Sequence, residues 1–201
     1  MSQSNYHHGD LRNALILAAV ELIEEKGSPD VAISEVAKRA GVSAAAPYRH
    51  FKDKEALLDA VSQLCFLGLG LQVIDVREKF EPGARECIIS LGITYTRYVS
   101  ERPAFYNMMW SEHSEKSEPL EETDGRRGFS NFADAVESWC IAKKLKRADP
   151  LDLAIKLWAL AHGLAVLNIN GQVDWFMPNA DLEDMLVSST NAFLDGVEKA
   201  G

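Results

Sequence analysis

The sequence predicts an all-α fold in which three N-terminal helices are followed by a long helix and a helical bundle. Three observations support this prediction. Apolar residues recur three or four positions apart along most of the chain, no segment after residue 81 alternates as a β-strand does, and Gly or Pro separates the periodic stretches. With 201 residues, 47% of them hydrophobic, the chain can bury a sizeable core.

The first helix is expected to run from a cap at Asp10 to about Gly27. Its apolar residues form one stripe at helical spacing: Leu11, Leu15, Ile16, Ala19, Leu22 and Ile23. The stretch Gly27-Ser28-Pro29 ends this helix, which we expect to support the two helices that follow it.

Residues 32–54 are expected to form two short helices joined by a tight turn. Val36 and Ala37 give the first of them an apolar face, and the small side chain of Ala37 allows the two helices to cross closely. Gly41 can adopt the left-handed conformation that follows the first helix, and the Ser43 hydroxyl can cap the second. This order of elements is a helix-turn-helix.

The same segment is positive in a chain that is negative as a whole. The chain carries 21 Lys and Arg against 30 Asp and Glu, for a net charge of −9. Residues 38–54, in contrast, contain five Lys and Arg and one acid, Asp53, for a net charge of +4. A local basic patch indicates phosphate binding, whereas the acidic remainder excludes nucleic-acid binding over the whole surface.

The motif Val36-Ala-x-x-Ala-Gly-Val-Ser, followed by Tyr48-x-x-Phe51-x-x-Lys54-Glu-x-Leu-Leu, resembles the signature of the TetR-type bacterial transcriptional regulators. The resemblance implies a homodimer that binds double-stranded operator DNA, usually as a repressor, and that responds to a small molecule. It also implies that Tyr48 and Lys54 contact DNA phosphates. The residues themselves do not separate a repressor from an activator.

Two positions depart from the pattern of this family. Ala32 stands where the family usually has Thr or Ser in a capping box with Glu35, so we expect a weaker helix start unless Ser34 substitutes for it. Pro47 stands where a large aliphatic residue is usual, and proline is tolerated only near the first turn of a helix.

The candidate DNA contacts are Lys38, Ser43, Ala44, Ala45, Pro47, Tyr48, Arg49, His50, Lys52 and Lys54. Alanine methyl groups can pack against thymine methyl groups in the major groove, and Arg49 is the best candidate for a bidentate guanine contact, with Ser43 a weaker one. Tyr48, Lys52 and Lys54 are expected to anchor phosphates and so fix the position of the protein on the duplex.

Neither a metal ion nor a cofactor is expected. Adjacent His7 and His8 point apart on an arm or helix and have no Cys or carboxylate partner at ligand spacing. The opening residues 6–12 resemble a subgroup of the same family, in which such an arm touches DNA phosphate. The cysteines are expected to be buried thiols rather than redox sensors: Cys65, Cys87 and Cys140.

Two domains are expected: a DNA-binding domain over residues 1–56 and a ligand-binding and dimerisation domain over residues 57–201. A long helix over residues 54–80 would connect them, and Gly68 and Gly70 allow a kink in it. Movement of this helix would change the separation of the two DNA-binding domains of a dimer.

The C-terminal body is expected to contain further helices near residues 83–101, 103–111, 125–145, 149–170 and 180–199, with the acidic stretch 112–124 as a loop. Its candidate ligand contacts are Tyr98, Tyr106, Met109, Trp110, Trp139, Trp158 and His162. Such rings can enclose a small, mostly apolar effector, although each of them could equally be an ordinary core residue. The spacing of Trp158, His162 and Gly163 resembles the Trp-His-Gly marker of one C-terminal domain type of the family.

Two antiparallel helices from each protomer, near residues 149–170 and 180–199, are expected to form a four-helix dimer interface. Such a dimer would read two half-sites about 34 Å apart or a multiple of that distance. No apolar run long enough to cross a membrane and no secretory leader are evident, which favours a cytoplasmic protein.

Two other functions remain as alternatives. An enzyme is disfavoured because the sequence contains no nucleophile elbow, no His and carboxylate metal site and no glycine-rich phosphate loop. A helical interaction protein could instead direct its basic segment at an acidic partner. The sequence therefore favours a DNA-binding regulator.

Overall fold

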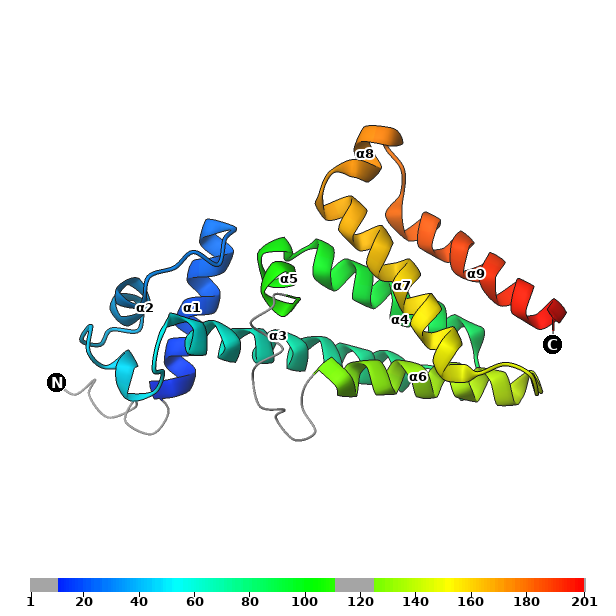
Figure 1. Ribbon diagram of the computed structural model, residues 1–201, viewed down its shortest axis with the longest axis horizontal. Helices are drawn as coiled ribbons and strands as arrows, with labels where there is room; N and C mark the ends of the chain where they lie inside the picture. The colour runs from blue at the N-terminus through cyan, green and yellow to red at the C-terminus, as the bar shows by residue number, and fades with distance from the viewer. Residues whose placement is uncertain (1–10, 111–124, 201) are drawn as a thin grey trace. The chain divides into compact units, whose positions relative to one another are not determined.

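The computed structural model describes residues 11–110 and 125–200, and every regular element among them is a helix (Figure 1). The elements are α1 (Leu11–Lys26), α2 (Ile33–Arg39), the 3-10 helix η1 (Pro47–Arg49), α3 (Lys54–Arg77), α4 (Arg85–Ser100), α5 (Pro103–Met109), α6 (Gly125–Ala142), α7 (Pro150–Ile169), α8 (Gln172–Phe176) and α9 (Leu182–Ala200). The all-α prediction is thus confirmed. Asp10, His7, His8 and the stretch 112–124 lie outside the described residues.

Helix α8 is the one described helix that the sequence did not predict. Its five residues are too few to show a helical period, and they follow Gly171, a residue that interrupts a periodic pattern. Gly171 has a φ of 69°, which lets the chain turn sharply between α7 and α8. The other α-helices begin and end within a few residues of their expected bounds.

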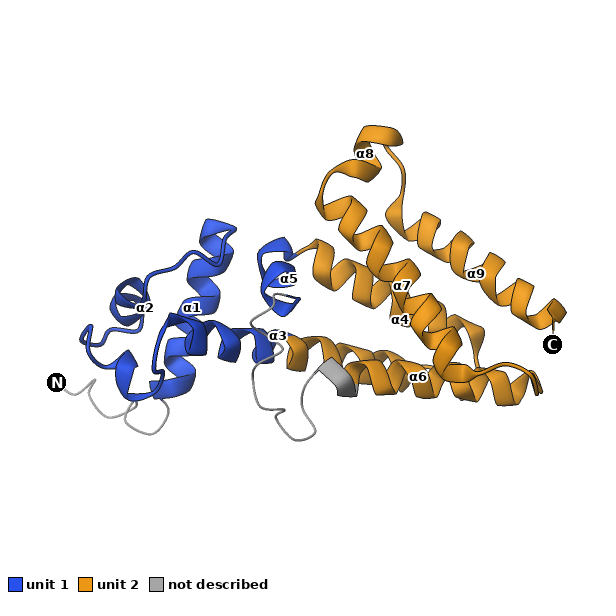
Figure 2. Cartoon of the chain, viewed as in Figure 1, with its two compact units in different colours: residues 1–65, 102–119 blue, residues 66–101, 120–201 orange. Residues whose placement is uncertain are grey.

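The described residues divide into two compact units (Figure 2). The boundary lies inside α3, between Cys65 and Phe66. The first unit contains α1, α2, η1 and α5, and the second contains α4 and α6 to α9. The functional boundary predicted at residues 56 and 57 stays a prediction.

The first unit is built around α1. Leu15 and Ile23 of the predicted apolar stripe are completely buried, and α2 adds Val36 to the same core. Phe51 and Leu57 are also buried. Burial of these side chains fixes α2 and the segment after it on α1 through apolar contact, the main favourable term in folding.

Only one of the two hydrogen bonds of a capping box is formed at the start of α2. A carboxylate oxygen of Glu35 accepts a hydrogen bond from the Ala32 N–H at 2.9 Å, and the same carboxylate lies 2.7 Å from the Lys26 ammonium. Ala32 has no side-chain oxygen with which to return the bond, as the sequence predicted, and no side-chain cap from Ser34 is formed.

The second unit packs α4, α6, α7 and α9 against one another. One core cluster joins these four helices, and the completely buried Trp139 of α6 lies within it. Its partners come from each of the other three helices: Ile88, Leu153, Ala154, Leu157 and Leu194. This packing fixes the faces that α7 and α9 leave exposed.

Candidate nucleic-acid interface

The turn after α2 is a Schellman motif. The Val42 N–H donates to the Ala37 carbonyl at 2.9 Å, and the Gly41 N–H donates to the Lys38 carbonyl at 3.1 Å. Gly41 has a φ of 72°, the left-handed conformation that this motif requires. The turn therefore directs residues 43–52 away from the end of α2, as expected for a helix-turn-helix.

The segment after this turn is not the α-helix that the sequence predicted. It is a hydrogen-bonded turn over residues 43–46 followed by the three-residue η1. The Ser43 hydroxyl makes no cap; the backbone carbonyl of Ser43 instead accepts from the Ala46 N–H at 3.0 Å. Pro47 accounts for the difference, because it has no N–H to donate to the Ser43 carbonyl.

Most of the candidate DNA contacts lie on the surface of the first unit. The exposed ones are Lys38, Ser43, Ala44, Ala45, Tyr48, Arg49, His50 and Lys52. Pro47 is buried, so it supports this surface from beneath. Lys54 is partly exposed at the first residue of α3. The structure thus gathers methyl groups, a phenol and cations within a short stretch, which is the composition of a DNA-reading surface.

Ion pairs reduce the positive charge of this segment. Arg39 binds Glu21 at 3.2 Å and Glu25 at 2.5 Å, and these hydrogen bonds raise the pKa of the guanidinium. The Lys54 ammonium lies 2.9 Å from the Asp30 carboxylate, and the hydrogen bond from Lys54 lowers the pKa of Asp30. Both pairs use acids outside residues 38–54, which a count within the segment cannot register.

Two cations of the segment have no acidic partner in the described part of the chain: Lys38 and Arg49. Lys52 pairs weakly with Asp53, because the ammonium nitrogen lies 3.8 Å from the carboxylate and the Lys52 side chain is 82% exposed. These three side chains are therefore the ones most available for phosphates and base edges.

Arg12 is a candidate that the sequence did not single out. Its guanidinium carbon lies 5.3 Å from the centre of the Phe51 ring. Phe51 directly precedes Lys52 in the sequence. The contact brings a cation from the start of α1 close to the segment after η1. Only the tertiary packing could reveal it, because 39 positions separate the two residues in sequence.

The candidate ligand contacts fall in both compact units. Tyr106, Met109 and Trp110 belong to the first unit, and Tyr98, Trp139, Trp158 and His162 to the second. Met109 and Trp139 are buried, and the indole N–H of Trp139 has no hydrogen-bond partner within the described residues. The Tyr98 hydroxyl lies 3.0 Å from the point where a Cβ on Gly68 would stand.

In the second unit, Trp158 and His162 belong to a ring cluster formed by Tyr95, Phe129, Trp158 and His162. The Trp158 centroid lies 5.3 Å from the His162 ring and 5.9 Å from the Phe129 ring. The Tyr95 hydroxyl and His162 Nδ1 share a hydrogen bond of 2.6 Å. Burial lowers the pKa of His162, so the imidazole is neutral near pH 7. The cluster combines apolar rings with one uncharged polar pair.

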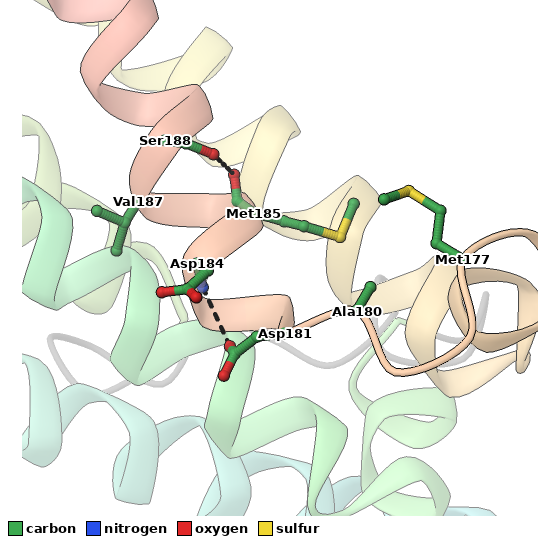
Figure 3. Close-up of a pocket in the computed structure, with 7 residues that line it drawn as sticks. All are labelled: Met177, Ala180, Asp181, Asp184, Met185, Val187 and Ser188. Carbon is green, nitrogen blue, oxygen red and sulfur yellow. Dashed lines mark hydrogen bonds between the residues drawn. The ribbon is translucent and has the colours of Figure 1, made fainter.

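A shallow hollow of about 470 Å³ lies elsewhere in the second unit, beside the first turns of α9 (Figure 3). It is lined by Met177, Ala180, Asp181, Asp184, Met185, Val187 and Ser188. Asp181 caps α9 by accepting hydrogen bonds from two backbone N–H groups, so its carboxylate already has partners. None of the candidate ligand contacts lines this hollow.

The cysteines are buried, as the sequence predicted. Burial raises the pKa of each thiol, to about 12 for Cys65, which keeps them as unreactive thiols. Within residues 11–110 and 125–200, no group of three His, Cys, Asp or Glu side chains could hold a metal ion.

Two family models match the chain. Residues 15–61 match the model described as bacterial regulatory proteins, tetR family. Residues 88–190 match the model described as tetracyclin repressor-like, C-terminal domain. The first covers the helix-turn-helix, and the second covers more than half of the 201 residues.

Individual relatives agree with these models. The chain is 29% identical over 127 residues to the HTH-type transcriptional regulator BetI of Serratia proteamaculans, a match covering 60% of this chain and 64% of that protein, just under two thirds of its length. A solved protein with unknown function from Rhodococcus sp. RHA1 is similar with a TM-score of 0.80 at 26% identity, covering 96% of this chain and 98% of that one.

The TetR family transcriptional regulator PfmR from Thermus thermophilus is similar with a TM-score of 0.55 at 22% identity, over 90% of this chain and 97% of that one, and shows the fold alone. The helix-turn-helix with its exposed cations, the all-α body and the two family models lead to the same conclusion: the chain belongs to the TetR family of bacterial regulatory proteins.

Proposed function

We propose that this protein is a ligand-responsive repressor that binds, as a homodimer, an operator with two half-sites. The proposal rests on four exposed residues: Tyr48, Arg49, His50 and Lys52. They belong to a helix-turn-helix whose apolar side chains are buried in its own core. A monomer with so short a reading segment contacts few base pairs, so two copies are needed to specify a site.

Within this surface, different side chains have different tasks. The guanidinium of Arg49, which has no acidic partner among the described residues, can bind the O6 and N7 of a guanine, and the alanine methyls can contact thymine. Tyr48, Lys38, Lys52 and Lys54 bind phosphates and supply affinity that does not depend on sequence. That the protein represses transcription, rather than activating it, is inferred from the usual role of the family.

The dimer is proposed to form through α7 and α9. Leu153 and Leu157 of α7 are buried inside the protomer and so are not available to a second copy. Other apolar side chains of this helix are exposed instead: Leu151, Ile155 and Leu167. On α9 the small residues Ser188, Ala192 and Gly196 are exposed at intervals of four. Exposed apolar side chains on one helix and exposed small residues on the other suit close packing of helices from two copies.

The effector is proposed to bind at the ring cluster. Its rings favour an apolar, partly flat molecule, and the neutral Tyr95–His162 pair favours one uncharged hydrogen-bonding group on that molecule. Such a ligand weakens DNA binding if it fits one conformation better than the DNA-bound one. By linkage, DNA then weakens ligand binding by the same factor.

We place the protein in the cytoplasm, where its DNA is. Helices α3 and α7 are long and apolar enough to cross a membrane by length and composition alone, but the core helices of a soluble protein pass the same test. Both helices contribute side chains to the cores of the units, among them Leu57 and Val61 of α3 and Leu153 and Leu157 of α7.

Selection of duplexes from a random pool tests the proposal. The purified protein should enrich one sequence with two related half-sites. It should also bind that duplex much more tightly than random DNA at physiological salt, the condition under which specific and non-specific binding differ by roughly a thousandfold or more. A thermal-shift screen of uncharged aromatic compounds should yield ligands that release the duplex. Enrichment of no sequence would refute the proposal.

A further inference from the structure

We infer that Pro47 is a specificity-determining residue, because it holds the DNA-reading segment as a turn and a 3-10 helix and so sets the directions of Tyr48 and Arg49. The inference rests on the proposed function, since it requires residues 43–52 to face DNA. Pro47 itself is buried and acts through the side chains that flank it.

Apart from Pro47, the segment favours an α-helix. Ala44, Ala45 and Ala46 have the highest helix propensity of any residue. In an α-helix the residue at position 47 would donate its N–H to the Ser43 carbonyl. Proline lacks this N–H, and its ring would collide with that carbonyl. The sequence therefore contains one identifiable cause for the loss of the α-helix.

The observed hydrogen bonds show what replaces it. The Ala46 N–H donates to the Ser43 carbonyl at 3.0 Å, and the Arg49 N–H donates to the Ala46 carbonyl at 3.2 Å. The His50 N–H donates to the Pro47 carbonyl at 2.9 Å. All three bonds span three residues, which is the spacing of a 3-10 helix, and a bond that spans four residues, from the Phe51 N–H to the Pro47 carbonyl, closes the segment.

The two geometries point the same side chains in different directions. A 3-10 helix returns to the same direction after three residues, whereas an α-helix leaves such residues roughly 60° apart. The 3-10 helix also rises about 0.5 Å more per residue. Arg49 follows Ala46 by three positions, so its guanidinium reaches a different point of the groove than it would from an α-helix. Hydrogen bonds to base edges do not tolerate displacements of this size.

The segment is anchored from below. The Phe51 N–H donates to the Pro47 carbonyl at 2.9 Å, and the Phe51 ring is buried in the core of the first unit. The short helix is therefore held at both its start and its end. The orientations of Tyr48 and Arg49 are thus set by the folded protein in the absence of DNA. This is the preorganisation that base recognition needs.

The test uses the full-length chain and two variants, Pro47→Leu, which keeps an apolar side chain in the buried site, and Pro47→Ala. Each variant is used to select duplexes from the same random pool as the wild type. Lys54→Met is the matched control. The Pro47 variants should enrich a different sequence and bind the wild-type operator about tenfold more weakly, with random-DNA affinity unchanged. Lys54→Met should weaken operator and random DNA equally and enrich the wild-type sequence.

A measurement on the wild type itself is independent of how well the variants fold. The Cα chemical shifts and amide contacts of residues 43–50 should retain the 3-10 pattern both free and bound to the selected duplex. A continuous α-helix on DNA, or the wild-type operator enriched with unchanged affinity by a folded Pro47 variant, would overturn the inference. If the wild type enriches no sequence, the proposed function fails instead.

Discussion

The hydroxyl of Tyr95 lies 2.6 Å from Nδ1 of His162, and this hydrogen bond joins α4 to α7 inside the second unit. The two rings are also stacked, with centroids 6.1 Å apart and planes inclined by 26°. Burial lowers the pKa of His162 from the ordinary value of 6.5. The folded protein therefore holds the imidazole neutral at pH values where the unfolded chain protonates it.

This relationship predicts how stability depends on pH. Because the folded pKa of His162 is depressed, the unfolded state binds more protons as the pH falls through 6.5, and the free energy of unfolding decreases until the pH reaches the folded pKa. Urea unfolding between about pH 8 and pH 5 measures the decrease. His162→Asn should remove its contribution from the slope, and an unchanged slope in this variant would contradict the prediction.

Arg49→Ala should relax the sequence preference of the protein. Loss of a bidentate guanine contact lowers operator affinity by about 1–3 kcal/mol while affinity for random DNA changes little. Fluorescence anisotropy with both duplexes measures the ratio. Lys38→Ala is the matched control, because Lys38 also has no acidic partner among the described residues and should weaken both duplexes alike. Equal losses for Arg49→Ala would exclude it from base reading.

Asp30→Asn should strengthen binding to every duplex severalfold. The Asp30 carboxylate competes with DNA phosphates for the Lys54 ammonium and also repels them, and asparagine keeps an oxygen acceptor without the charge. Titrations against operator and random DNA measure the gain. Asp75→Asn breaks a comparable pair with Lys79 in the second unit and should have little effect. Weaker binding by Asp30→Asn would show that Asp30 orients Lys54 for DNA.

Gly83→Ala should lower the free energy of unfolding by roughly 2–4 kcal/mol. Gly83 has a φ of 87°, and a Cβ there would lie 2.6 Å from the Ala142 Cβ and 3.0 Å from the Ser138 carbonyl oxygen. Gly70→Ala is the control, because a Cβ at Gly70 meets nothing within 4 Å and alanine should stabilise α3 by up to about 1 kcal/mol. Thermal unfolding of both variants compares them.

Ile155→Glu should shift the protein from dimer to monomer. The side chain of Ile155 is 45% exposed on α7, and a carboxylate there would be buried against the second copy. Sedimentation velocity measures the mass as a function of concentration. Ile141→Glu at the end of α6, where the side chain is 71% exposed, is the control and should remain dimeric. A dimeric Ile155→Glu would place the interface elsewhere.

Local sequence was sufficient for much of the fold. The spacing of Leu15 and Ile23 identified the buried face of α1, and Gly41 identified the left-handed residue after α2. Both signals are local: a helix shows its buried face at every turn, and only glycine adopts a positive φ without a steric penalty. The exposed position of Arg49 and the basic charge of its segment were also accessible from sequence.

Other features were decided by contacts between distant residues. The sequence around Arg39 and Lys54 does not show that Glu25 and Asp30 bind them. The positive charge available to DNA phosphates could therefore be estimated only from the tertiary structure. Pro47 was recognised as unusual, but propensity alone could not say that its neighbours would form a turn and a 3-10 helix.

The sequence by itself thus determined most of the α-helices, the family motif and the location of the reading segment, because those depend on spacing along the chain. Tertiary structure decided which side chains of α7 are exposed, how Tyr95 and His162 pair and which cations near the reading segment are held by acids. The physical reason is that burial and ion pairing depend on distances between atoms, and folding sets those distances for residues that the chain holds far apart.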